Sequence, residues 1–341
     1  MPTRIAFFTD LHLRGQGPSS RKDDYPASIL NKLEYCLDYA SKNSDIALFG
    51  GDFCHSHKLA SDPVKEKAIE LFDNYLKVPF IYTWGQHDLN GKDYNSRHVS
   101  SQAFILRQAS RVIPDIEESP ADKDLIKEIN GVKVGFISCP SGFDPIKWSI
   151  RMSKRGKPKG VDVRVALVHH LLTNEQEDWY IDPELFCTGD KDNRVIDVVL
   201  CGDLHQGFEP FRNSFDTLFL NPGSLGRTQK TKNDLVRPIR GVDVSIDEKT
   251  KECSWSYWDV ESALSGDEVF RKSAPIIEEK VGIDIDDRTE GDKVEFEEVM
   301  TVLEGIGAER IDIWDMLERE ARKKKLEDPL INYILSKRPD A

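Results

Sequence analysis

The sequence IAFFTDLH at residues 5–12 is an apolar run that ends in the pair Asp10 and His12. Much later, the run VVLCGDLH at residues 198–205 ends in the same way, in Asp203 and His205. A single Asp-x-His is weak evidence, because polar residues commonly begin the loop after a strand. Its repetition behind two strand-like runs predicts that both strand ends contribute to one site.

Strand-like and helix-like segments alternate around the first of these runs. Strand-like runs at 4–9, 46–51 and 78–84 are separated by helical spacing over 27–42 and by a helix start at Ser61-Asp62-Pro63. This β-α-β-α-β order favours parallel strands joined by crossover helices, with ligands at the carboxyl ends of the strands.

The later strand-like runs lack long intervening helices, which predicts a second sheet packed on the first. They are VKVGFIS, VRVALVH, VIDVVLC, TLFLN, GVDVSI and CSWSYWDV. We therefore expect an α/β fold, a four-layer αββα sandwich, over residues 1–262. Residues 263–341 are acidic and poor in strands, and we expect a small helical C-terminal region there, with helices near 292–304, 311–325 and 328–336.

Composition limits how the chain could hold a partner. The 47 Lys and Arg against 60 Asp and Glu give a net charge of -13, so binding of nucleic acid by bulk attraction is disfavoured. The six cysteines form no C-x-x-C pair and are expected to be buried thiols. No run has the length of a signal peptide or a membrane span, so we expect a cytoplasmic protein with no membrane contact.

Five strand-like runs end in carboxylate, amide or imidazole side chains, and all eight histidines lie between residues 12 and 205. Oxygen and imidazole ligands on one sheet edge suit borderline divalent ions such as Mn²⁺ better than a sulfur-rich structural zinc site. The candidate residues are Asp10, His12, Asp52, His55, Gln86, His87, Asp88, His169, His170, Asp203 and His205.

In order, these residues resemble the signature of the calcineurin-like metallophosphoesterases: D-x-H, G-D, G-N-H-[DE], H and G-H-x-H. The resemblance covers roughly residues 4–260, and Asn221-Pro222-Gly223-Ser224 is similar to a turn found in that family, although a purely structural turn is an equal alternative. Within the family, GGDFCHSHK at 50–58 resembles the nuclease subunit of the double-strand-break repair complex, the SbcD type. The G-D-x-V-D-R-G segment of protein phosphatases is absent.

The resemblance implies two divalent ions, with Mn²⁺ expected and Mg²⁺ as the alternative. It assigns Asp10, His12 and His205 to one ion and Gln86, His169 and Asp203 to the other, with Asp52 as a bridge. His169 is preferred over His170 because it is the first residue beyond VALV. Gln86 and Asp203 depart from the family's Asn and His.

The resemblance also implies roles for three residues that are not ligands. It gives His87 the task of stabilising transition-state charge or protonating the leaving oxygen, with Asp88 orienting its ring, and places His55 against the phosphate. The reaction it implies is hydrolysis of phosphodiester bonds in DNA without a covalent intermediate.

The partners implied by the SbcD-type resemblance are DNA and a coiled-coil ABC-type ATPase, and a homodimer is a further alternative. Apolar spacing in the C-terminal region could provide the ATPase-binding face or could cap the sandwich. The short C-terminal region resembles compact viral forms, in which case the location is the host cytoplasm. A basic stretch could contact DNA or be an ordinary exposed loop: Trp148, Arg151, Lys154, Arg155, Lys157 and Lys159.

Two other functions remain as alternatives. One is a phosphodiesterase acting on small molecules or cyclic nucleotides with the same two ions. The other is a non-catalytic scaffold for DNA ends, because both departures from the family pattern, Gln86 and Asp203, fall on the second ion.

Overall fold

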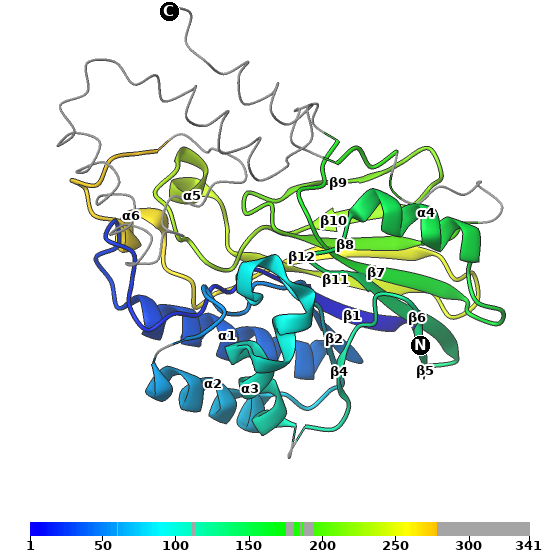
Figure 1. Cartoon of the computed structure of the whole chain (residues 1–341), viewed down its shortest axis with the longest axis horizontal. Coiled ribbons are helices and arrows are strands. Elements are labelled where there is room, and N and C mark those ends of the chain that lie inside the picture. The colour runs from blue at the N-terminus through cyan, green and yellow to red at the C-terminus, as the bar shows by residue number, and fades with distance from the viewer. Residues whose placement is uncertain (60, 111–112, 175–180, 185, 187–193, 278–341) are drawn as a thin grey trace, which may run out of the picture. The chain divides into compact units, whose positions relative to one another are not determined.

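The computed structural model describes residues 1–277, except residues 60, 111–112, 175–180, 185 and 187–193. Two six-stranded sheets and the helices that cover them account for most of this part of the chain (Figure 1). The described residues belong to one compact unit, which extends from Met1 to Gly282.

The first sheet has the strand order β12-β11-β1-β2-β3-β4. Its four strands β1 to β4 are parallel, and β11 and β12 add antiparallel strands beyond β1. The strands are β1 (Thr3–Phe8), β2 (Ile46–Phe49), β3 (Phe80–Tyr82), β4 (Ile116–Glu118), β11 (Arg240–Ile246) and β12 (Cys253–Asp259).

The second sheet has the order β5-β6-β7-β8-β10-β9, with a parallel centre and one antiparallel strand at each edge. Its strands are β5 (Leu125–Ile129), β6 (Val132–Cys139), β7 (Val163–His169), β8 (Val198–Gly202), β9 (Phe208–Arg212) and β10 (Leu218–Asn221).

Three helices connect the strands of the first sheet and a fourth precedes β7 in the second. They are α1 (Tyr25–Asn43), α2 (Asp62–Tyr75), α3 (Ser101–Ala109) and α4 (Pro145–Arg155). Short helical turns complete the described chain: η1 (Asn90–Lys92), η2 (Tyr94–Val99), α5 (Lys232–Val236) and α6 (Gly266–Val269).

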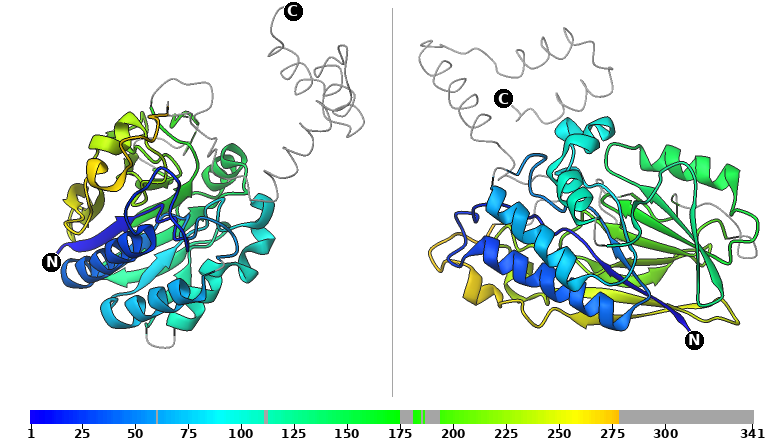
Figure 2. Two further views of the ribbon diagram at one scale, coloured as in Figure 1. Left: turned by 90° about the vertical axis from the view of Figure 1, so that its left-hand side faces the viewer. Right: turned by 90° about the horizontal axis from the view of Figure 1, so that it is seen from below.

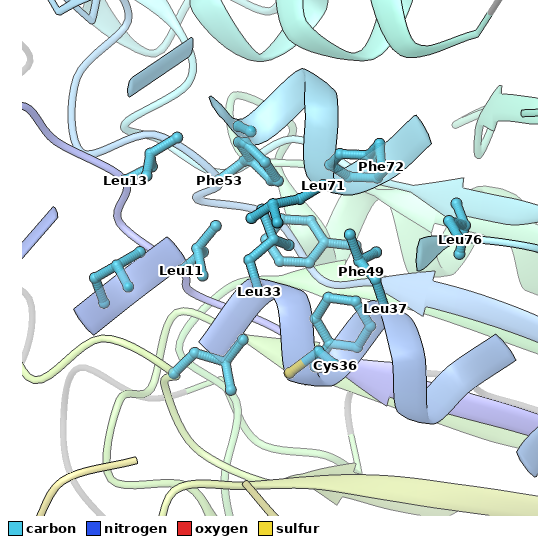
Figure 3. Close-up of a cluster of buried hydrophobic side chains, with 14 of the residues drawn as sticks. Leu11, Leu13, Leu33, Cys36, Leu37, Phe49, Phe53, Leu71, Phe72 and Leu76 are labelled. Carbon is cyan, nitrogen blue, oxygen red and sulfur yellow. The ribbon is translucent and has the colours of Figure 1, made fainter. Parts of the chain in front are cut away.

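Alternation along the strands separates the core into layers. In β1, Ala6 and Phe8 pack with α1 and α2, whereas Ile5 and Phe7 pack between the two sheets. Figure 3 shows the outer layer, where Phe49 of β2 lies among leucines of both helices. On the outer face of the second sheet, Trp148 and Met152 of α4 cover β6, β7 and β8. This arrangement confirms the αββα sandwich (Figure 2).

Local signals explain where two of the helices begin and end. The Asp24 carboxylate accepts a hydrogen bond from Ala27 N at the start of α1, and Asp144 caps α4 in the same way ahead of Pro145. Helix α4 ends at Arg155 and is followed by Gly156, whose φ of 68° is favourable for glycine.

Two sequence-based expectations differ from this structure. β11 and β12 extend the first sheet rather than the second, because β11 pairs with β1. The basic stretch is mostly the helix α4 rather than a loop. The domain boundary expected at residue 262 stays a prediction. The helices expected near 292–304, 311–325 and 328–336 lie outside the described residues.

Five cysteines of the described chain are free thiols, as expected, and Cys187 lies outside it. Among the described residues, no helix combines the length and the apolarity that crossing a bilayer requires.

Candidate metal centre

The candidate residues come together where parallel strands of both sheets end. Asp10 and His12 follow β1, Asp52 follows β2, Gln86 and His87 follow β3, His169 ends β7, and Asp203 and His205 follow β8. The two sheets face each other, so these ends form one edge of the sandwich. The expectation that distant strand ends share one site is therefore met.

The backbone at this edge takes conformations that cost energy. Asp10, His12, Asp52 and Asp203 have φ of 54°, 51°, 54° and 75°. Non-glycine residues in this left-handed region typically cost about 1–3 kcal/mol each and concentrate at functional sites. The packing is also close, since a Cβ on Gly85 would lie 1.8 Å from Asp52 Oδ1.

Asp10, His12 and His205 form the first group of candidate ligands, with ligand atoms within 4.8 Å of one another. The His12 and His205 Nε2 atoms are 2.9 Å apart, and Asp10 Oδ1 lies 3.7 Å from His205 Nε2. Two nitrogens bound at right angles to one ion, each about 2.0–2.1 Å away, would be about 3 Å apart. The spacing of these side chains therefore fits a shared divalent ion.

Asp10, Asp52 and His169 form a second, overlapping group. His169 Nδ1 lies 2.7 Å from Gly50 O and donates to it, which leaves Nε2 with a lone pair directed toward Asp52 Oδ2 at 3.3 Å. Among the described residues, neither Nε2 nor Oδ2 forms a hydrogen bond of acceptable geometry, although both are buried. A cation would satisfy both atoms, so this group also fits a metal ion.

Electrostatics couple Asp52 to His169. Burial alone would raise the pKa of Asp52, but the neighbouring His169 and His87 imidazoles outweigh it and hold that pKa below its usual range. Burial would lower the pKa of His169, and the Asp52 carboxylate instead raises it well above its usual range. The Asp52 carboxylate thus favours positive charge at the position of His169 Nε2, and a cation bound there by the neutral imidazole would replace the proton.

The two neighbouring histidines 169 and 170 have different roles. His170 Nε2 lies 3.1 Å from Pro140 O, so its ring is engaged with the loop after β6. His169 is the member of the pair that joins the cluster, as preferred from its place at the strand end.

His87 lies above the same centre, where its Nε2 is 3.8 Å from Asp52 Oδ2. Its Nδ1 is 2.9 Å from His55 O and donates to that carbonyl, which fixes the ring. The His55 ring is stacked on the His87 ring, with centroids 5.2 Å apart, and both belong to a third group with His12.

Asp88 does not orient the His87 ring, contrary to the role that the resemblance implied. Its carboxylate accepts backbone N–H groups of Phe53, Cys54 and Gly85 at 3.0 to 3.2 Å. It therefore ties the loop after β2 to the loop after β3. The His55 carbonyl orients His87 instead, a contact that side-chain motifs do not reveal.

Gln86 and Asp203 contact each other, with Gln86 Nε2 donating to Asp203 Oδ1 at 2.7 Å. Both are only partly buried, and Asp203 is absent from the three groups found among the described residues. The Asp203 backbone N–H donates to Asp10 Oδ1 at 3.2 Å. The two departures from the family pattern thus form one adjacent pair beside Asp10.

Thr9 and Ser224 support Asp10, and the sequence reasoning did not identify their roles. Thr9 Oγ1 donates to Asp10 Oδ2 at 2.6 Å, and Ser224 Oγ donates to Asp10 O at 2.9 Å. The Asn221-Pro222-Gly223-Ser224 turn therefore positions the strand end that carries Asp10. The one signal for Thr9 was its place between the strand and the carboxylate.

Most side chains of the basic stretch form hydrogen bonds or ion pairs with other residues of this chain. Trp148 and Arg151 donate to Ala121 O, Arg155 pairs with Asp124, and Lys157 pairs with Asp197. Lys154 and Lys159 remain exposed. This surface is a weaker candidate for contact with DNA than the sequence indicated.

A family model described as calcineurin-like phosphoesterase matches residues 3–207, whereas no curated protein matches the chain. A calcineurin-like phosphoesterase, YfkN from Bacillus subtilis, is 13% identical with a TM-score of 0.44, covering 77% of this chain and 92% of its own.

Two structures from Thermus thermophilus are similar at the same level, both with a TM-score of 0.41. A hypothetical protein is 12% identical over 75% of this chain and 99% of its own. A 5'-nucleotidase precursor is 14% identical over 78% of this chain and 56% of its own. On the strength of the family match over more than half its length, the chain belongs to the calcineurin-like phosphoesterase family.

Proposed function

We propose that this protein is a DNA nuclease that hydrolyses phosphodiester bonds with two divalent ions, with Mn²⁺ as the preferred metal. The observation that carries the proposal is the convergence of carboxylates and imidazoles into three overlapping groups at one edge of the sandwich. The His55 ring stacked on His87 supports the nuclease assignment, because His55 belongs to the GGDFCHSHK stretch that resembles the SbcD-type subunit.

The family depends on two divalent ions, and this chain has clusters that fit them. Asp10, His12 and His205 would hold one ion; Asp52 would bridge; His169, Asp203 and Gln86 would hold the other. When bound, such a pair supplies Lewis acidity at phosphorus and lowers the pKa of a water molecule.

The protein's own groups have two further tasks. His87, with Nδ1–H on the His55 carbonyl, presents Nε2 toward the centre and, in its protonated form, donates a proton or hydrogen bond to the leaving oxygen. Asp88 keeps the loops that carry Asp52 and His87 in register by binding three backbone N–H groups.

We also propose that a coiled-coil ABC-type ATPase assists this nuclease. With a net charge of -13, the chain has little general attraction for DNA, and a partner would supply much of the grip. The segment that we expected to bind it lies outside the described residues.

The proposal is tested by incubating the full chain with end-labelled duplex and single-stranded DNA, and in parallel with a 3',5'-cyclic nucleotide. Each substrate is offered with Mn²⁺, Mg²⁺ or a chelator, with and without the ATPase. We expect Mn²⁺-dependent DNA cleavage that the chelator abolishes. Hydrolysis of the cyclic nucleotide alone would make the protein a small-molecule phosphodiesterase, and DNA binding without any hydrolysis would make it a scaffold.

A further inference from the structure

Arg14 lies beside the metal centre without belonging to any of its ligand groups. Leu13 pairs with Cys54 in a short parallel bridge, in which His55 N donates to Leu13 O at 3.0 Å. Leu13 and Cys54 both point into the apolar core under the helices. Because neighbours along an extended segment point to opposite sides, Arg14 and His55 lie on the other side, with the metal centre.

Within the described part of the chain, the Nη1 atom of Arg14 is buried and has no hydrogen-bond acceptor. Arg14 is half-buried, whereas the fully buried Arg21, Arg164 and Arg237 pair with Asp23, Asp124 and Asp234. The buried Arg227 instead donates to the carbonyls of Leu264 and Arg237. A buried charged donor left unpaired is costly, and phosphate oxygens are among its strongest acceptors.

The positive charge of Arg14 acts on the neighbouring His55. Burial is the main cause that lowers the pKa of His55, to about 2, and the Arg14 guanidinium is the next. The Arg14 guanidinium therefore lies close enough to the His55 ring to interact with it electrostatically.

We infer that Arg14 is a substrate-binding residue whose guanidinium contacts a phosphate of the substrate. The inference rests on the proposed phosphodiester hydrolysis, and it adds a cationic group that the family signature does not assign. The phosphate is either the reacting one or its neighbour along a DNA strand, and both are phosphodiester anions that a guanidinium binds through paired N–H donors.

The test compares Arg14→Met and Arg14→Lys with the control Lys249→Met. Lys249 is exposed in the turn between β11 and β12, which lies next to Thr3 at the opposite end of β1, so its variant removes one positive charge away from the site. The substrates are an end-labelled oligonucleotide and bis(4-nitrophenyl) phosphate, which contains only the reacting phosphate.

We expect Arg14→Met to raise KM by about 10- to 100-fold, the effect of losing a charged hydrogen bond, with kcat changing less. Arg14→Lys should recover part of the loss, and Lys249→Met should behave as wild type. A raised KM with both substrates assigns the contact to the reacting phosphate. A raised KM with the oligonucleotide alone assigns it to a neighbouring phosphate.

An activity-independent measurement is the affinity of the manganese-loaded protein for inorganic phosphate by calorimetry. Where Arg14 contacts the reacting phosphate, we expect Arg14→Met to weaken this affinity while Tm is unchanged or higher. Unchanged KM for both substrates together with unchanged phosphate affinity would overturn the inference, as would a lower Tm with normal KM. Wild type that hydrolyses the small diester but not DNA would refute the nuclease assignment and leave Arg14 testable on the diester.

Discussion

The outer face of the first sheet and its carboxyl edge are formed by the same strands. Buried side chains of the face pack against apolar neighbours, whereas buried polar atoms at the edge lack hydrogen-bond partners among the described residues. On the outer face, Phe49 is fully buried against rings of Phe8 and Phe53 and the helices α1 and α2 (Figure 3). At the carboxyl edge, Asp52 lies three residues further along the chain and is equally buried, yet its Oδ2 lacks a hydrogen-bond partner among the described residues.

The difference shows where stability and function lie. The apolar face contributes burial free energy, whereas the edge combines buried polar atoms with left-handed backbone at Asp10, His12 and Asp52. We conclude that the burial free energy of the helix-covered face offsets the free-energy cost of the edge, which bound cations would lower. Variants of the two regions should therefore fail in different assays.

The largest expected effect is that of Asp52→Asn, which removes the bridging carboxylate. We expect activity to fall by at least about 10³-fold, because the charge that holds both ions together is lost. Added Mn²⁺ should raise the Tm of wild type but hardly that of the variant, as measured by calorimetry. The control is Asp62→Asn, which changes an exposed carboxylate at the start of α2. An Asp52→Asn variant that keeps normal metal-dependent activity would remove Asp52 from the site.

Next is His87→Ala, which should lower kcat by about 10²- to 10⁴-fold, the usual contribution of a positioned acid or electrostatic group. Metal content, measured by mass spectrometry, should stay as in wild type, because the ring is proposed to act on the leaving oxygen. The exposed His98→Ala is the matched control. Loss of metal along with activity would make His87 a ligand instead.

Phe49→Ala should act on the other region. Truncating this buried ring should lower the free energy of unfolding by about 3–5 kcal/mol, measured by urea denaturation. Phe104→Ala removes a half-exposed ring of α3 and should cost about 1 kcal/mol or less. The folded Phe49 variant should keep its kcat, and a large loss of kcat would show that the two regions are not separable.

The smallest effect is expected at the partly buried pair Gln86 and Asp203. Asp203→Ala should weaken the affinity for the second ion by about 10- to 100-fold, while the affinity for the first ion stays unchanged. Asp203→His should shift preference toward softer ions such as Zn²⁺. Equal affinity for both ions in wild type and Asp203→Ala, measured by titration calorimetry, would leave Asp203 as a turn residue.

The two regions also differ in how far the sequence predicts them. Apolar periodicity predicted the helices α1 and α2 and the sandwich, because burial on one face repeats regularly along the chain. Polar residues after the strands predicted which residues gather at the site, because parallel strands end at one edge of the sheet. β11 was assigned to the wrong sheet, because its pairing with β1 depends on contacts far apart in sequence.

Two details of the site could not be read from motifs. The His55 carbonyl orients His87, and Asp88 binds backbone N–H groups, so both roles depend on main-chain geometry. Arg14 belongs to none of the motifs. Its Nη1 atom is buried and lacks an acceptor among the described residues, which only the positions of its neighbours reveal.

The most direct test of the central claim is an anomalous diffraction map from crystals of the full chain grown with Mn²⁺. We predict two manganese peaks at the carboxyl edge. One should lie among Asp10, His12 and His205, and the other beside His169 and the Gln86 and Asp203 pair, with Asp52 between them. A single peak, or none at this edge, would contradict the account of a two-ion phosphodiesterase.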